Sequence, residues 1–124
     1  MSEIRATTIS DSAGTGPITL TGQSAAKAWL FYNGTGNAIR DSYNVASVTD
    51  NGAGDFTKNM TSAFSSANYS TIGGSGTAAS DYRLVTPNFN AAPTTTATRM
   101  RVHYASTTPT DDAYISSTSH GDLA

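Results

Sequence analysis

Apolar residues in this chain come in short runs in which they alternate with polar residues, and clusters of Gly, Asn, Asp, Pro and Ser separate the runs. A period of two is typical of half-buried β-strands, and the separating clusters are typical of turns. The pattern predicts an all-β fold, an antiparallel β-sandwich or jelly-roll-like domain of eight or nine strands. The predicted strands are 4–9, 18–21, 26–33, 38–50 with a bend near Asp41, 56–64, 69–72, 82–86, 98–105 and 113–117.

The chain length of 124 residues leaves room for one domain, so residues 1–124 are predicted to form a single β-sandwich. Residues 1–16 are expected to be either an N-terminal arm or the first strand. Segments 73–80, 87–96 and 106–112 are rich in Gly, Pro, Ser, Thr and Asp and are predicted loops. The clearest turn is Asp50-Asn-Gly-Ala-Gly-Asp55, because Asn-Gly and Gly-Asp supply the positive φ angles of a tight hairpin.

Two predicted strands differ in how they distribute apolar side chains. In Arg99–Tyr104, Arg99, Arg101 and His103 share one face, and Met, Val and Tyr share the other. This is typical of a sheet with one solvated face and one core face. In Ala28–Tyr32 both faces are apolar, because Trp29 and Phe31 point away from Leu30 and Tyr32. Such a strand is either central to the monomer or packed against another subunit on its second face.

Composition and charge exclude several functional classes. Charged residues make up 13% of the chain, the net charge is −2 and there is no basic run, which argues against a nucleic-acid partner. No stretch approaches 18 apolar residues, so no membrane-spanning segment is expected. The chain has no Cys, which removes disulfides and thiolate metal sites.

Residues that could carry chemistry are few and scattered. His103 lies on a polar strand face, His120 is near the C-terminus, and Asp111 and Asp112 are adjacent in a predicted loop where turn roles explain them. The Gly-rich segment 73–80 lacks the helix that a phosphate loop needs, and 50–55 lacks the spacing of a calcium loop. We therefore expect no catalytic residues, no metal site and no cofactor, and a protein that is not an enzyme.

The segment from Gly14 to Tyr69 resembles a module found in tail-fibre-type virion proteins of bacteriophages, especially cyanophages. The resemblance is carried by the order and spacing of AKAW, NGTG, AIRDS, TDNG and GD, followed by the ANY of 67–69. It covers about half of the chain, and the second half follows the pattern loosely through RMRVHY and DDAYISSTSHGD. The resemblance implies a β-rich, homotrimeric structural component on the particle surface, made in the host cytoplasm, and it implies no catalytic residues.

The chain departs from the pattern of this module at two positions. Phe31 stands where the module has Asn, which adds an apolar side chain to the strand that is apolar on both faces. Lys58 stands between Phe56 and Met60 where the module has an apolar residue, which predicts a core face open at an edge or a subunit seam. Trp29, Phe31 and Lys58 are therefore the predicted subunit-interface residues.

Two functions from different classes follow. The first is a non-enzymatic virion structural protein, either a capsid decoration (cement) protein or a short tail fibre, with the major capsid protein or tail proteins as partners. The alternative is a carbohydrate-binding module that contacts host surface polysaccharide, which the six Tyr and one Trp would suit. A small depolymerase is disfavoured, because the carboxylates are few and unclustered.

Overall fold

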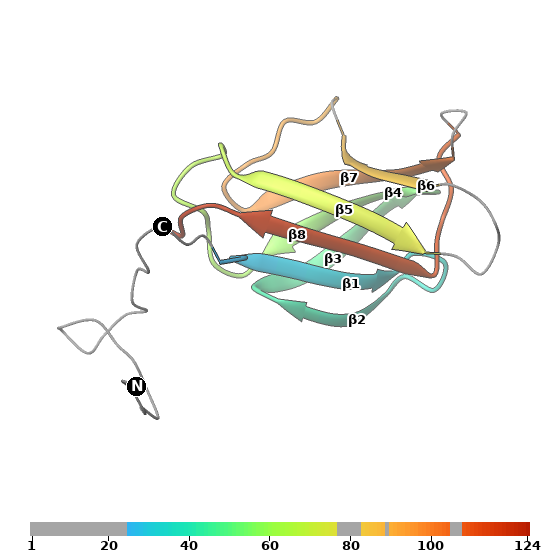
Figure 1. Cartoon of the computed structure of the whole chain (residues 1–124), viewed down its shortest axis with the longest axis horizontal. Coiled ribbons are helices and arrows are strands. Elements are labelled where there is room, and N and C mark those ends of the chain that lie inside the picture. Colours follow the sequence, from blue (N-terminus) through green and yellow to red (C-terminus); the bar gives the residue numbers. More distant parts are fainter. Residues whose placement is uncertain (1–24, 77–82, 89, 105–107) are drawn as a thin grey trace, which may run out of the picture.

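A computed structural model of the chain describes residues 25–76, 83–88, 90–104 and 108–124. These residues form an all-β sandwich of two four-stranded antiparallel sheets, in the orders β2-β1-β8-β5 and β3-β4-β7-β6 (Figure 1). This confirms the predicted fold class. The strands are β1 Ala28–Asn33, β2 Ala38–Tyr43, β3 Val45–Gly52, β4 Asp55–Met60, β5 Ser70–Gly76, β6 Arg83–Pro87, β7 Ala97–Tyr104 and β8 Tyr114–His120.

The predicted strand 38–50 is wrong as one element, because the chain changes sheets within it. β2 pairs with β1 in one sheet and β3 pairs with β4 in the other. The junction is Asn44, which has a φ of 54°. Its side-chain amide donates to the carbonyls of Lys27 and Ser62, and its Oδ1 accepts from the Ser62 amide. Asparagine tolerates this left-handed conformation and satisfies the backbone groups that the crossing leaves unpaired.

The predicted loop 73–80 is also partly wrong. Residues 73–76 continue β5, which pairs with β8 from Ser70 to Gly76. Gly73 faces the interior, where an added Cβ would lie 2.5 Å from Cγ1 of Val85 on β6. The close approach of β5 to β6 on that side of the sandwich therefore requires a glycine in the strand.

The hairpin at 50–55 is confirmed. It joins β3 to β4, and Gly52 and Gly54 have φ angles of 118° and 62°. Asp50 closes the turn by accepting the Gly52 amide on Oδ1 at 2.9 Å. At Gly54 a Cβ would also lie 2.3 Å from the Thr110 amide nitrogen, so close packing and positive φ both favour glycine.

The interior contains two apolar clusters. The larger one joins residues of β1, β4, β6, β7 and β8, namely Leu30, Tyr32, Phe56, Val85, Met100, Val102 and Ile115. The smaller one contains Ala28, Met60 and Phe64. Met100 and Val102 are fully buried, which confirms the predicted core face of 99–104, although Tyr104 at the end of the strand is exposed.

The predicted strands 4–9 and 18–21, and the arm or first strand in 1–16, lie outside the described residues.

Candidate functional site

The sheet β2-β1-β8-β5 presents an aromatic outer face. We define it by Trp29, Phe31, Tyr43, Ile72 and Tyr114. Phe31 is 36% exposed, Tyr43 54%, Ile72 66% and Tyr114 48%, while Trp29 is half-buried. Alternation places these side chains opposite the buried Leu30 and Ile115 of the same strands.

The strand register makes this face continuous. Tyr43 pairs with Trp29, Trp29 with Thr118, and Thr118 with Ile72, so one row of side chains crosses all four strands. Phe31 is two residues further along β1 on the same face. Its ring lies 6.3 Å from that of Tyr114 in a stacked arrangement, with an interplanar angle of 22°.

A β-bulge places a cation on the aromatic pair. Phe31 pairs with Asp41 and Tyr32 with Ile39, so Arg40 is the extra residue of β2. Its guanidinium carbon lies 4.9 Å from the Tyr114 ring centre and 5.8 Å from that of Phe31. Arg40 Nε also donates to the Ala113 carbonyl at 3.3 Å. Cation–π contacts at exposed sites contribute about 0.5–1 kcal/mol, so they favour this orientation of the rings.

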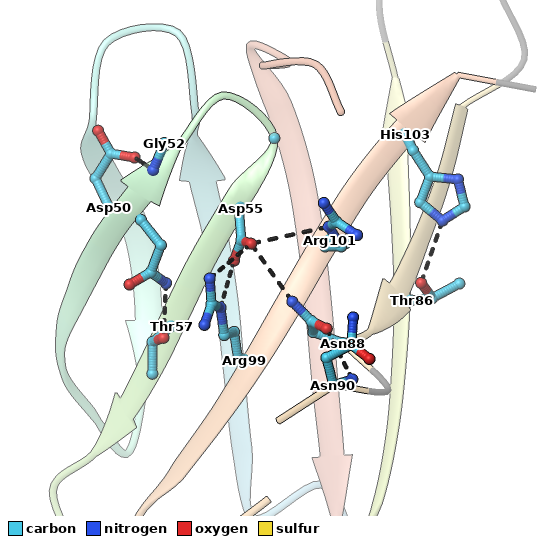
Figure 2. A network of polar contacts seen from close by, with 12 residues as sticks. Asp50, Gly52, Asp55, Thr57, Thr86, Asn88, Asn90, Arg99, Arg101 and His103 are labelled. Atoms are coloured by element: carbon cyan, nitrogen blue, oxygen red, sulfur yellow. Dashed lines mark hydrogen bonds and ion pairs between the residues drawn. The ribbon is translucent and has the colours of Figure 1, made fainter. Parts of the chain in front are cut away.

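The outer face of the other sheet carries an internally paired polar network (Figure 2), with Leu84 of β6 also exposed on it. Arg99 on β7 donates two hydrogen bonds to Asp55 on β4, at 2.7 and 2.9 Å. Arg101 Nε lies 3.8 Å from the same carboxylate, and Asn88 donates to it at 3.4 Å. The hydrogen bonds to Asp55 raise the pKa of the Arg99 guanidinium. The Arg99 and Arg101 pair is thus held by a carboxylate of its own chain.

Lys58 occupies the interior, so the prediction that it lies at an open edge or subunit seam is wrong. Its side chain is fully buried on the inner face of β4. Nζ donates to the hydroxyls of Ser117 at 3.0 Å and Ser119 at 2.8 Å on β8, and Ser119 also bonds to the Thr71 hydroxyl at 2.8 Å. Hydrogen bonds to hydroxyls of the opposite sheet, and not a subunit boundary, explain why a lysine stands at this position.

The protonation of Lys58 follows from these surroundings. Among the described residues, no carboxylate lies within ion-pair distance of Nζ. Burial therefore disfavours the charged form without compensation and lowers the pKa of Lys58 to about 8. The lysine lies between Phe56 and Met60 on β4, so a polar section separates the two apolar clusters.

The other sequence-predicted candidates have separate local partners. His103 is on the polar outer face, with Nε2 3.3 Å from the Thr86 hydroxyl (Figure 2), and His120 ends β8. Asp111 accepts the Gly54 amide, and the buried Asp112 accepts the Tyr114 amide in a local turn. Within the described ranges no group of three or more His, Cys, Asp or Glu side chains is placed to hold a metal ion.

Sequence reasoning found Trp29 and Phe31 but missed Arg40, Tyr43, Ile72 and Tyr114. Tyr43 and Tyr114 are both exposed. Alternation in β1 was the available signal for the first two residues. The other four residues lie beside them only because of the strand order β2-β1-β8-β5, and that order depends on long-range pairing.

Comparisons with models of protein families, with curated protein sequences and with solved structures each found no match. Across the described part of the chain, no helix is long and apolar enough to span a membrane. The aromatic outer face is therefore the feature from which a function is inferred.

Proposed function

We propose that this chain is a non-enzymatic structural protein of a bacteriophage virion, a homotrimeric surface component that acts as a capsid decoration protein or a short tail fibre. The observation that carries the proposal is the aromatic outer face, with Phe31, Tyr43, Ile72 and Tyr114 all exposed on one sheet. Contiguous apolar patches of this kind mark interaction sites more often than solvent-facing surface. Other virion proteins, the major capsid protein or tail proteins, would anchor the trimer.

The contrast between the two outer faces supports an assembly role. The polar face is internally paired around Asp55 and can remain in water. The aromatic face is covered by nothing else within the described residues, apart from Arg40 over Phe31 and Tyr114. Closed rotational symmetry is the usual way for identical subunits to bury such a face. The resemblance of 14–69 to a phage tail-fibre module supports the virion as the location.

The virion assignment is tested on particles. Phage particles purified from an infected culture are analysed by quantitative mass spectrometry and labelled with an antibody against the protein. We expect the protein in intact particles, with hundreds of copies for a capsid lattice or a few dozen at most for a tail appendage. Absence of the protein from purified particles would exclude the virion role.

The role of the aromatic face in assembly is tested on the purified full-length chain by sedimentation. We expect a trimer for the wild type and a monomer or an aggregate for Trp29→Ser. The matched control is Thr57→Ser, which changes an outward position of β4 on the polar face. A wild-type chain that sediments as a monomer at micromolar concentration contradicts the trimer.

A carbohydrate-binding function is a second candidate, because the stacked Phe31 and Tyr114 rings are exposed and held in place by Arg40. Rigid aromatic platforms of this kind can stack on sugar rings. Titration with host envelope polysaccharide, followed by Trp29 fluorescence, tests it, with Phe31→Ala as the control. Lack of any saturable change in the wild type removes this candidate.

A further inference from the structure

One half of the aromatic outer face carries large projecting side chains, and the other half carries glycine and serine. On the β1 and β2 side, Trp29, Phe31, Tyr43 and the Tyr114 ring project outward, and we call these four residues the ridge. Beside the ridge, the outward positions are occupied by Gly74, Gly76 and Ser116, and we call these three residues the trough. Ser116 pairs with Phe31 on one side and with Gly74 on the other, so ridge and trough adjoin.

The glycines of the trough are not explained by the chain's own fold. Neither Gly74 nor Gly76 has a positive φ, unlike Gly52 and Gly54. An added Cβ at Gly74 would come no nearer than 3.5 Å to Ser116 Oγ, and at Gly76 no nearer than 4.0 Å to Tyr114 Cβ. Both are ordinary contacts, whereas Gly73 has no such room. Glycine in a strand that needs it for neither conformation nor internal packing is typical of a site that another chain approaches closely.

We infer that the occupant of this face is another copy of the same chain, with the ridge of one copy packed into the trough of the next. This inference rests on the proposed structural function and names its partner surface. The relief is self-complementary, because each copy supplies one ridge and one trough on the same face. A contact of this kind is reciprocal about a two-fold axis, or runs head to tail around a three-fold axis when successive copies are rotated by 120°.

Charge is compatible with self-packing. The charged residues beside the ridge are Arg40, which already lies over Phe31 and Tyr114, and Asp41, which pairs with Phe31. Their charges are opposite, so these two residues add no net charge to the contact. On the polar face, by contrast, Arg99 and Arg101 are already paired with Asp55 of their own chain, so that face needs no partner.

Three of the four sheet edges are poor sites for edge-to-edge association. β2 carries the bulge at Arg40, and β3 has register shifts between Val45 and Ser47 and between Asp50 and Gly52. β6 ends in Pro87. Bulges, charges and proline on edge strands all discourage pairing with a further strand. Copies of this chain are therefore not expected to meet through β2, β3 or β6, which leaves the aromatic outer face and its edge strand β5.

The size of the face sets the strength of the contact. Four strands about 4.8 Å apart, with six or seven residues at about 3.3 Å each, span roughly 19 by 22 Å in projection. Specific interfaces of the smaller class bury roughly 600 Å² of accessible surface per partner. The relief of the aromatic side chains raises the accessible area above the projected one, so the face suits a small, specific interface.

The first test fills the trough. Gly74→Tyr places a side chain where the ridge of the next copy would pack, and the room around Gly74 allows the monomer to fold. We expect sedimentation as a monomer with association weakened roughly 30-fold or more, as for loss of a central interface contact, and an unchanged or raised Tm. The matched control is Ser47→Tyr at an exposed position of β3 on the polar face, which should assemble as the wild type does. Assembly of Gly74→Tyr at wild-type strength overturns the inference.

The second test joins ridge to trough covalently. The chain has no cysteine, so Phe31→Cys combined with Gly74→Cys introduces the only two. Both positions pair with Ser116 from opposite sides, which places them two strand spacings apart, about 9.6 Å, too far for a disulfide within one chain. Oxidation should therefore link separate copies. The control pair is Ser47→Cys with Ala97→Cys, which flank Asn59 in the same way on the polar face.

The covalent product separates the inference from the function on which it rests. A closed covalent trimer from the Phe31 and Gly74 pair, with little product from the control pair, supports both the surface and the trimer. A closed covalent dimer supports the surface and contradicts the proposed trimer. Equal cross-linking by the two pairs, or a wild-type chain that stays monomeric at 100 micromolar, overturns the surface, while the virion role is still decided by the particles.

Discussion

β7 and β8 are both inner strands of their sheets, yet they distribute polarity in opposite ways. β7 turns Met100 and Val102 inward and its arginines outward. β8 turns Ser117 and Ser119 inward and Tyr114 outward. Of these two strands, β7 therefore has a mainly apolar inner side and a charged outer side, while β8 has two buried hydroxyls beside Ile115 on its inner side and an aromatic ring on its outer side.

This difference indicates how the chain divides its hydrophobic stabilisation. The hydroxyls of β8 accommodate the buried Lys58, which weakens the interior at that point. Apolar area that a self-sufficient monomer would bury lies instead on the outer face, around Phe31 and Tyr114. Association through that face would recover it. The reversal of polarity in β8 thus fits a subunit better than a monomer.

The largest expected effect contrasts the two strands directly. Met100→Ala removes a fully buried side chain of β7 and should lower the free energy of unfolding by about 3 kcal/mol. Tyr114→Ala on β8 should change that of the monomer by less than about 1 kcal/mol, because the ring is 48% exposed. Urea unfolding at a protein concentration below the association range measures both. Equal losses would mean that Tyr114 stabilises the monomer and would break the contrast.

The second effect is a pH dependence that comes from the inner face of β8. In the folded chain the pKa of Lys58 is lowered from 10.5 to about 8. Below pH 8 the lysine is charged in both states, and the cost of burying the charge is fully present. Between pH 8 and 10.5 the unfolded chain holds more protons, so stability rises with pH, by about 3 kcal/mol in total.

Urea unfolding at pH 7.5 and 9.5 measures this rise. Burial raises the pKa values of Tyr32 and Tyr69, which makes stability fall as the pH passes above about 10, so the lower part of the window is the cleaner one. A flat profile between the two pH values, identical in the wild type and in Lys58→Met, would contradict a protonated lysine in the core at neutral pH.

The sequence predicted the contrast in part. The alternation in 99–104 correctly placed Met100 and Val102 inside, and the alternation in 28–32 correctly separated Leu30 from Phe31. The same rule places Lys58 inside, but lysine is rare in a core, so the prediction assigned it to a seam. The hydroxyls that accept its hydrogen bonds are 59 and 61 residues away, on another sheet.

Two elements escaped prediction for reasons of local chemistry. Glycines are depleted in strands, so 73–76 was assigned to a loop although its pairing with β8 makes it a strand. Asn44 interrupts no alternation, so the change of sheet there left no pattern to detect. The two glycines of the trough lie on β5, which sequence reasoning had assigned partly to a loop. The row from Tyr43 to Ile72 needs both β5 and the change of sheet at Asn44. This is why sequence reasoning reached only Trp29 and Phe31 of the aromatic outer face.

The third effect tests the lysine by replacement. Lys58→Met keeps a long side chain and removes the buried amino group, so we expect about 2 kcal/mol of added stability at pH 7. The gain is smaller than the pH effect because Ser117 loses its hydrogen-bond partner. Thr57→Met, on the outer face of the same strand, is the control and should change little. Destabilisation at pH 7 would show that the Lys58–serine contacts outweigh the desolvation of the amine.

The smallest effect concerns the polar face. Asp55→Asn removes the charge that holds Arg99, Arg101 and Asn88 together but preserves the shape of the side chain. Because Arg99 is partly exposed, the decrease in Tm should be well below that of Met100→Ala, and 1 M NaCl should reduce the difference from the wild type. The sedimenting mass should not change, because the polar face is outside the proposed contact. Loss of assembly in Asp55→Asn, at unchanged Tm, would mean that the paired arginines bind the next copy, and the assignment of roles to the two faces would have to be reversed.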